Sequence, residues 1–326
     1  MTERLDIVAI GNAVVDVVAQ VPDEFLAANG VEKGIMTLID QPRALSLYGA
    51  MPAAQEISGG SAANTAAGAA AIGAKTAFFG RIRDDQLGQI FTHDIRAIGV
   101  QYDGPVLAAG PETSRCLVLV SPDGERSMST FLGASVGLNV TDIDTDLLAR
   151  ADWLYLEGYL FDTPEAKEAY AGAIAATKSG GGKTSVTLSD PFCVDRHRAD
   201  FRRLIRDDLD LLFANKAEVL SLYETNDLDT ALNEVAQEVD LAAITLSEEG
   251  AVVVRGDQRT HVPATATQVV DTTGAGDLFA GGFLAGLAEG ADDARCARMG
   301  CAAAGEIISH LGARPEADLK ALMAGV

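Results

Sequence analysis

The chain has 326 residues, of which 48% are hydrophobic and 22% charged, so it can bury a large core. Its formal net charge of −22 repels phosphate backbones and argues against a nucleic-acid partner. The four cysteines lack metal-ligand spacing, and the apolar run 7–10 is too short for a signal peptide or a membrane span. We therefore expect a cytoplasmic protein with reduced thiols and no membrane contact.

The first part of the chain combines one buried strand with several half-exposed ones. Residues 5–10 form an apolar run that predicts a buried strand ending at Gly11. Pro122-Asp123-Gly124 predicts a hairpin turn. The other segments with strand patterns are 14–21, 34–40, 113–120 and 126–132. Because no helices intervene, we expect a small, separate antiparallel sheet that forms a lid.

Elsewhere strand and helix patterns alternate, which is typical of a mostly parallel sheet flanked by helices. The expected strands are 76–79, 153–156, 184–188, 209–213 and 242–246. The expected helices are 61–72, 84–98, 164–178, 198–206, 216–222, 229–239, 277–288 and 293–309. We thus predict one α/β domain over residues 1–326, with lid strands inserted at about 14–40 and 111–132. Ligands of such sheets bind at the carboxyl ends of the strands.

The segment Asp271-Thr-Thr-Gly-Ala-Gly-Asp277 carries the most specific chemical pattern. Gly274 and Gly276 allow a tight turn whose N–H groups converge at the start of an apolar helix, which makes an anion site. A carboxylate beside an anion site is unfavourable in a purely structural role, because the two negative charges repel each other. It is expected where the carboxylate must meet a hydroxyl group that attacks the anion. The alternative is an aspartate that caps a glycine-rich turn, which is common.

Two further segments place polar side chains near glycines. Gly59 and Gly60 permit close approach of a ligand, and Asn64 lies one helical turn later on the same face. Asn12 and Asp16 interrupt an apolar stretch after the first strand. Each segment alone also fits a structural role, as a turn before a core helix or as an edge strand with a solvated aspartate.

Asn215 and Glu218 follow another buried strand. Their spacing places both side chains on one helix face, where they could hold a hydrated Mg²⁺. A helix cap with a surface glutamate is the structural alternative.

Together these segments resemble the PfkB (ribokinase-like) family of carbohydrate and nucleoside kinases over nearly the whole chain. Residues 59–88 are similar to the first family signature, 271–277 to the second, and 215–218 to the NxxE motif. The resemblance implies a kinase that uses ATP and Mg²⁺ to phosphorylate a hydroxyl group of a small molecule. It also makes a monovalent cation, K⁺, plausible near Asp271 and Thr273.

The resemblance implies a role for each matching residue. Asp277 matches the general base. The anion hole for the transferred phosphoryl group matches Gly274, Ala275 and Gly276. Asn215 and Glu218 match the pair that positions Mg²⁺ and phosphate. The implied acceptor contacts are Asn12, Asp16, Gly59, Gly60 and Asn64, with Asp16 on vicinal hydroxyls. The implied nucleotide contacts are Asn215, Thr245, Ser247 and Gly250, with Cys301 in the part flanking adenine.

The acceptor is predicted from residues 124–135, which resemble the adenosine-kinase branch. Arg126 is a candidate phosphate contact there, and an exposed hairpin arginine is the alternative. We expect adenosine to be phosphorylated on its 5′-hydroxyl to give AMP. Apolar lid residues are candidates to cover the base, namely Val14, Val18, Met36, Cys116, Phe131 and Leu132.

Two other functions remain open from the sequence. One is a sugar kinase acting on ribose, fructose or 2-keto-3-deoxygluconate. The other is a non-catalytic nucleoside- or nucleotide-binding sensor, against which Asp277 argues because a sensor needs no base. The sequence leaves the oligomeric state unknown, and both a monomer and a lid-mediated dimer are compatible with it.

Overall fold

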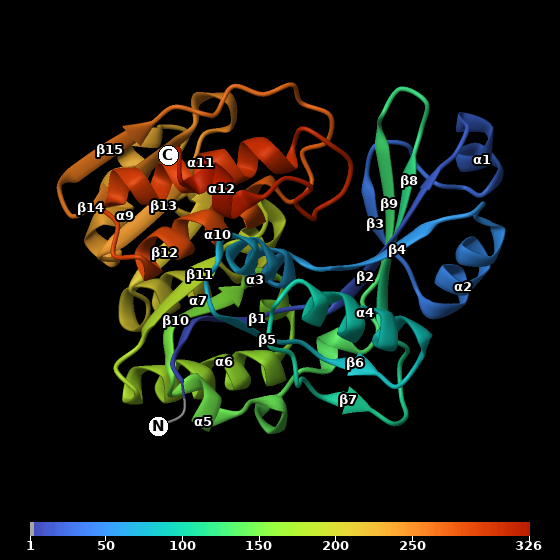
Figure 1. Ribbon diagram of the computed structural model, residues 1–326, viewed down its shortest axis with the longest axis horizontal. Helices are drawn as coiled ribbons and strands as arrows, with labels where there is room; N and C mark the ends of the chain where they lie inside the picture. Colours follow the sequence, from blue (N-terminus) through green and yellow to red (C-terminus); the bar gives the residue numbers. More distant parts are fainter. Residues whose placement is uncertain (1–2) are drawn as a thin grey trace.

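The computed structural model describes residues 3–326 and contains a large sheet with a smaller sheet beside it (Figure 1). The strands of the large sheet follow the order β15-β14-β13-β12-β11-β10-β1-β5. Those from β13 to β5 run parallel, whereas β14 and β15 are antiparallel additions at one edge. Their bounds are β1 (Leu5–Ile10), β5 (Thr76–Phe79), β10 (Ala151–Glu157), β11 (Lys183–Thr187), β12 (Leu211–Asn215), β13 (Leu241–Thr245), β14 (Ala251–Arg255) and β15 (Gln258–Val262).

Helices cover both faces of this sheet. One face packs against α3 (Ser61–Ile72), α4 (Gln86–Ala97), α10 (Ala275–Ala288) and α11 (Asp293–Ile307). The other packs against α5 (Thr145–Leu148), α6 (Pro164–Ser179), α7 (Pro191–Asp208), α8 (Lys216–Leu222) and α9 (Leu228–Glu238). Because side chains alternate along a strand, Tyr155 faces the first group while Leu154 and Leu156 face the second.

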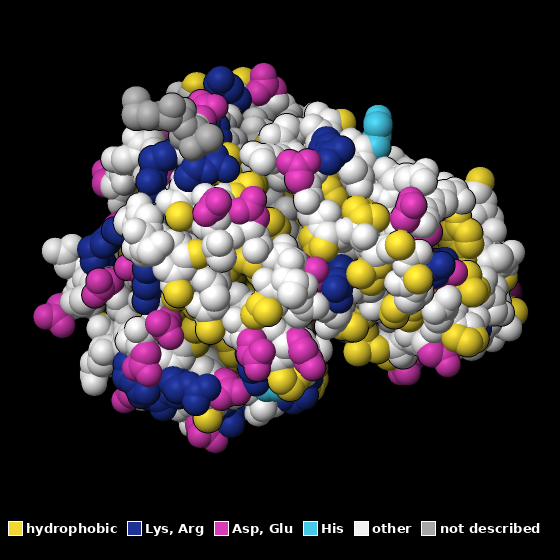
Figure 2. All heavy atoms as spheres, turned by 90° about the horizontal axis from the view of Figure 1, so that it is seen from below, with side chains coloured by type: hydrophobic (Ala, Val, Ile, Leu, Met, Phe, Trp, Pro, Cys, Tyr) yellow, Lys and Arg dark blue, Asp and Glu magenta, His cyan; other side chains and the backbone are white. Residues whose placement is uncertain are grey.

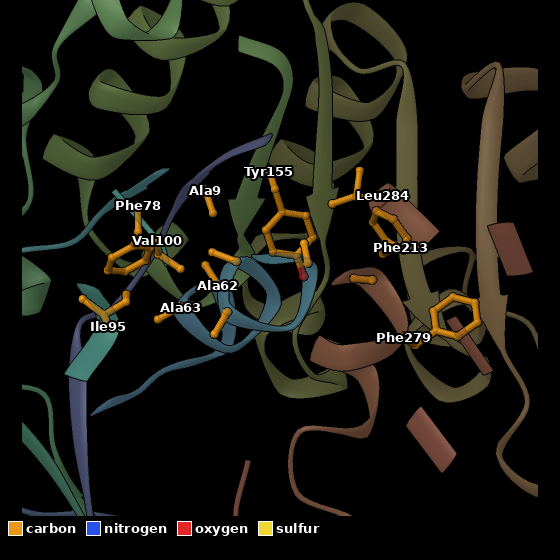
Figure 3. Packing of buried hydrophobic residues seen from close by; sticks show 14 of the residues in the cluster. Ala9, Ala62, Ala63, Phe78, Ile95, Val100, Tyr155, Phe213, Phe279 and Leu284 are labelled. Atoms are coloured by element: carbon orange, nitrogen blue, oxygen red, sulfur yellow. The ribbon is translucent and has the colours of Figure 1, made fainter. Parts of the chain in front are cut away.

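Small residues let α10 approach its neighbours closely. A Cβ on Gly281 would lie 2.8 Å from the carbonyl oxygen of Thr65 in α3, and one on Gly282 would lie 2.6 Å from that of Met299 in α11. Aromatic and aliphatic side chains fill the remaining space between α10 and the sheet, as Figure 3 shows for Tyr155 and Phe213. The start of α10 is thereby held at the carboxyl edge of the strands.

The smaller sheet is the expected lid, and its strands follow the order β3-β9-β8-β2-β4. They are β2 (Val14–Gln20), β3 (Met36–Leu38), β4 (Gln55–Gly59), β8 (Ser114–Val120) and β9 (Arg126–Phe131). The pairs β8–β9 and β2–β4 are antiparallel, and β2–β8 and β3–β9 are parallel. Helices α1 (Asp23–Ala28) and α2 (Gln41–Ala50) belong to this lobe. Hydrophobic side chains are frequent on its surface in Figure 2, and Ile35, Met36 and Leu38 are among those exposed.

The predicted fold class is confirmed, and four expectations need correction. Helices α1 and α2 lie between strands of the smaller sheet, where no helix was expected, and two of its strand pairs are parallel. Helix α7 begins at Pro191 rather than at residue 198, because Asp190 caps it by accepting a hydrogen bond from the Cys193 N–H at 2.6 Å. Strand β4 and the hairpin β14–β15 were not expected. The remaining short elements are β6 (Ile82–Arg83), β7 (Val106–Leu107) and α12 (Leu319–Met323). Within residues 3–326, no helix is both long and apolar enough to cross a membrane.

Candidate active site

The start of α10 offers backbone donors at the carboxyl edge of the large sheet, although the Ala275 N–H already donates to the Thr272 carbonyl oxygen at 3.3 Å. Gly274 precedes the helix in the left-handed conformation, with a φ of 77°, and no side chain of the described residues caps it. The first-turn N–H groups of a helix have no partner within the helix, so they attract an anion. Gly276 is exposed, and a Cβ there would meet no atom within 4 Å. The space in front of these donors is therefore open.

The carboxylate of Asp277 is held at this turn by two donors from α3. The Ser61 hydroxyl donates to Asp277 Oδ1 at 2.7 Å, and the Asn64 amide donates to Oδ2 at 2.9 Å. Burial raises the pKa of Asp277 above its ordinary value, and these hydrogen bonds and the charge of Arg314 oppose the rise. A fixed carboxylate with a raised pKa is a suitable acceptor for a hydroxyl proton.

Asp16 lies on the lid strand β2, and a glycine lets the neighbouring strand approach it. A Cβ on Gly59 would lie 2.5 Å from Asp16 Oδ2. The pKa of Asp16 is raised to about 6, mainly by burial; the charges of Arg314 and Arg126 oppose the rise, and those of Asp277 and Asp271 add to it. Asp16 and Asp277 are thus close enough to interact, as expected for two groups of one site.

Gly60 joins strand β4 to helix α3 and contacts the loop after β1. Its φ is 99°, and a Cβ would lie 2.1 Å from the carbonyl oxygen of Asn12, so only glycine fits. The structure therefore brings Asn12, Asp16, Gly59, Gly60 and Asn64 together, and their contact with an acceptor stays a prediction.

Glu157, at the end of β10, is a site residue that the sequence analysis missed. Its Oε1 accepts from the Asn12 side-chain amide at 2.6 Å, and its Oε2 accepts from the N–H groups of Asn12 at 3.3 Å and Ala62 at 2.9 Å. Burial raises its pKa to about 7. Asn12 Oδ1 is buried and has no partner among the described residues, so it can accept a hydrogen bond from a ligand.

We predict that Glu157→Gln reverses the Asn12 amide, because an amide of residue 157 would present an N–H where Asn12 needs an acceptor. Asn12 would then offer N–H in place of its free oxygen, and the KM for the acceptor should rise about tenfold, as for one lost hydrogen bond. In the wild type, KM should also rise as the pH falls below about 7, where Glu157 gains a proton. Steady-state kinetics from about pH 5.5 to about pH 8.5, roughly 1.5 units on either side of the transition, measure both effects. An unchanged KM in the variant would contradict this role.

Arg126 connects the lid to the loop before α10. Its Nη1 lies 2.7 Å from Asp271 Oδ2 and donates to Thr273 Oγ1 at 2.5 Å. Asp271 also accepts from the N–H groups of Thr273 and Gly312, both at 3.0 Å. The Arg126 side chain is only 9% exposed, so it is not the exposed hairpin arginine of the alternative interpretation. A monovalent cation at Asp271 would compete with Arg126, and K⁺ binding stays a prediction.

A cavity lies between the lid and this loop. The lid lines it with the polar residues Asp16, Ser58 and Arg126 and with the apolar residues Val18, Cys116, Val118 and Met128, and the facing loops contribute Thr273 and Arg314. Its free space of about 30 Å³ holds no more than a few water molecules. Of the lid residues expected to cover a base, Val18 and Cys116 line the cavity and Val14 packs with them, whereas Met36 is exposed elsewhere.

Asn215 and Glu218 form a capping box at the start of α8. Asn215 donates from its backbone N–H to Glu218 Oε2 at 2.9 Å and from its side chain to Oε1 at 2.6 Å, and it accepts from the Glu218 N–H at 2.8 Å. Burial raises the pKa of Glu218 to about 7. No cluster of three or more His, Cys, Asp or Glu able to hold a metal exists within residues 3–326. The buried carboxylate nevertheless fits a hydrated cation, whose charge would offset its burial.

The other predicted nucleotide contacts are Thr245, Ser247, Gly250 and Cys301. Thr245 is paired with Asn215 at the carboxyl ends of β13 and β12. Ser247 is exposed in the following turn, which Gly250 closes with a φ of 94°. Cys301 is only 6% exposed in α11, and burial raises the pKa of its thiol to about 11.

The two halves of the site lie at one edge of the large sheet. Glu157 ends β10 and Asn215 ends β12, and the parallel strand β11 lies between these two strands. The capping box therefore lies two strands away from the carboxylate that accepts from the start of α3.

A helix-flanked parallel sheet, a lid and a glycine-rich turn with an aspartate are the features of an α/β kinase. The model of the pfkB family of carbohydrate kinases matches residues 40–319. The chain belongs to this family, and it is a phosphotransferase that acts on a hydroxyl group.

Two solved structures match almost the whole chain. An adenosine kinase from Sinorhizobium meliloti is 49% identical, with a TM-score of 0.92 and 99% of each chain covered. A probable sugar kinase from Rhizobium etli CFN 42 is 48% identical, with the same TM-score and coverage. Among curated proteins, fructokinase-1 from Oryza sativa subsp. japonica is 28% identical over 240 residues, which cover 72% of this chain and 74% of that protein.

Proposed function

We propose that the protein is an adenosine kinase that transfers the γ-phosphoryl group of ATP to the 5′-hydroxyl of adenosine. The observation that carries this proposal is the face of the lid that lines the cavity, where a carboxylate lies beside apolar side chains. Asp16 offers a carboxylate for vicinal hydroxyls, and Val18, Cys116, Val118 and Met128 offer an apolar surface for a flat base. The 49% identity to an adenosine kinase supports the same acceptor.

Asp277 would accept the proton as the acceptor oxygen attacks the γ-phosphorus and the bond from that phosphorus to the β–γ bridging oxygen breaks. The N–H groups at the start of α10 would hold the oxygens of the transferred group, where negative charge is greatest. Arg126 would leave Asp271 and neutralise phosphate charge when the ligands bind. Asn215 and Glu218 would hold the hydrated Mg²⁺, which supplies further charge neutralisation.

Movement of the lid is part of this proposal. The cavity is too small for a nucleoside, so the lid must open for entry and close again over the bound acceptor. Closure would exclude water from the phosphoryl group and so suppress ATP hydrolysis.

A sugar kinase is the second candidate, and it is favoured by one observation. The curated relatives of this chain include fructokinases, and a structure with 48% identity is named a probable sugar kinase. A non-catalytic sensor is less consistent with the site, because two side chains hold Asp277 in place beside an open anion site.

The test compares kcat/KM for adenosine, guanosine, ribose, fructose and 2-keto-3-deoxygluconate at fixed MgATP. Adenosine is expected to be the best acceptor. A free sugar that exceeds it tenfold, which is about 1.4 kcal/mol in transition-state binding, would replace adenosine with that sugar. Absence of turnover with every acceptor would favour the sensor. The Asp277→Asn variant, prepared identically, controls for contaminating kinases.

A further inference from the structure

Arg314 enters the site from the segment that follows α11, and no motif in the sequence pointed to it. Its Nη1 donates to the Asn64 side-chain oxygen, and its Nη2 donates to the Ser58 hydroxyl at 2.8 Å. The guanidinium lines the cavity that also contains Asp16. It therefore lies between the lid, the start of α3 and the turn before α10.

Each of the two residues that Arg314 contacts donates in turn to a carboxylate. Asn64 donates from its amide nitrogen to Asp277 Oδ2 at 2.9 Å. Ser58 donates from its hydroxyl to Asp94 Oδ2 at 2.6 Å, and its backbone N–H donates to the same atom at 2.7 Å. A continuous network thus runs from Asp94 on α4 through Arg314 to Asp277 on α10.

We propose that Arg314 is a positioning residue for the proton acceptor: it orients the Asn64 amide toward Asp277 and supplies the positive charge beside that carboxylate. The inference rests on the proposed role of Asp277 as the base. It adds a residue from another part of the chain to the glycine-rich turn, Asp277 and Asn64.

The orientation follows from the chemistry of the two side chains. A guanidinium has only donors, so the Asn64 oxygen must face Arg314 and the Asn64 N–H groups must face Asp277. Without Arg314, the amide could turn over and place its oxygen against the carboxylate. Lysine cannot reproduce this arrangement fully, because a single ammonium lacks the planar fork that bridges Asn64 and Ser58.

The charge matters because the groups around Asp277 are mostly neutral or acidic. Ser61 and Asn64 donate to it from α3, and its charge raises the pKa of Asp16 on the lid and of Tyr155, Glu157 and Tyr159 in and after β10, although burial is the larger cause for each of them. Burial raises the pKa of Asp277, whereas the charge of Arg314 lowers it. Removing that charge should therefore move the pKa of Asp277 upward, so that a larger fraction is protonated and inactive at a given pH.

The experiment compares the wild type with Arg314→Gln, Arg314→Lys and a matched control, Arg203→Gln. The Arg203→Gln variant also loses one positive charge, but the Arg203 side chain is 68% exposed and pairs with Asp200 on the surface. Carbon-13 NMR of aspartate carboxyl groups follows the pKa of Asp277 without any need for turnover. Asp277→Asn identifies the signal, and Asp16→Asn and Glu157→Gln separate the neighbouring titrations.

In Arg314→Gln we expect the pKa of Asp277 to rise by about one unit or more, and the acidic limb of the kcat profile to move by the same amount. Arg314→Lys should keep the pKa near that of the wild type but lower kcat at its plateau about tenfold, because the amide is no longer held. Arg203→Gln should change neither. Thermal melting shows whether each variant is folded. If Arg314→Gln is unfolded, the plateau kcat of the folded Arg314→Lys variant tests the inference.

An unchanged pKa of Asp277 in folded Arg314→Gln, or a lysine variant with full plateau activity, would overturn the inference. The proposed function fails by a different result, which is a wild type that phosphorylates no acceptor. In that case the NMR titration still decides whether Arg314 controls Asp277. If the acceptor is a sugar instead of adenosine, the same pH profiles are measured with that sugar.

Discussion

Asp277→Asn is expected to lower kcat by about 10²–10⁴-fold, which is the usual contribution of a positioned acid or base. Asparagine has nearly the same shape but cannot take up the proton. It also fits the existing hydrogen bonds. The Ser61 hydroxyl can rotate to accept from the new amide, while the remaining oxygen accepts from Asn64. The lower kcat should therefore result from the missing proton acceptor and not from misfolding.

Steady-state kinetics and calorimetry of acceptor binding test this prediction together. The dissociation constant for the acceptor should change little, since the substitution removes an interaction that matters most in the transition state. A variant whose kcat stays within about threefold of the wild type, a difference below 1 kcal/mol, would remove Asp277 from the role of base.

Asp16→Ala is expected to lower kcat/KM by about 10²–10⁴-fold, because two hydrogen bonds to a charged group contribute about 1.5–3 kcal/mol each. A carboxylate accepts from two vicinal hydroxyls at once, so its loss should weaken binding and also misplace the reacting hydroxyl. KM should rise and kcat should fall. In the wild type, acceptor affinity should weaken as the pH falls through about 6, where Asp16 becomes protonated.

Substrates that lack one hydroxyl distinguish this role from a general effect on the lid. With the wild type, 2′-deoxyadenosine should be a poorer substrate than adenosine. With Asp16→Ala, removal of the hydroxyl should cost little more, because its partner is already gone. Equal deoxy penalties in both proteins would show that Asp16 does not contact that hydroxyl.

Much of the α/β framework could be predicted because its signals are local. The apolar run of β1 and the glycines on either side of α3 mark those elements directly. Strand β4, Gln-Glu-Ile-Ser-Gly, has no comparable pattern and becomes a strand only by pairing with β2. That pairing is what brings Gly59 against Asp16. Strand β14 is apolar, but the strand–helix alternation does not predict an antiparallel hairpin at the sheet edge.

The candidate site shows the same limit. Asp277 and Asn64 lie beside glycines that form recognisable turns, whereas Arg314 reaches Asn64 across 250 residues of sequence. No local sequence pattern predicts such a contact. Glu157 did carry a usable signal, because it ends the buried strand β10 with a charge at the edge where ligands bind. A carboxylate in that position is a candidate ligand contact.

The position of Gly312 and Arg314 also affects how the enzyme is made. A ribosome-bound chain that has emerged only as far as Asp277 already contains the glycine-rich turn and the aspartate. It still lacks the Gly312 N–H that anchors Asp271 and the Arg314 guanidinium that contacts Asn64. Synthesis must pass residue 314 before these contacts can form. Chains that end before residue 314 would therefore be unable to complete the site.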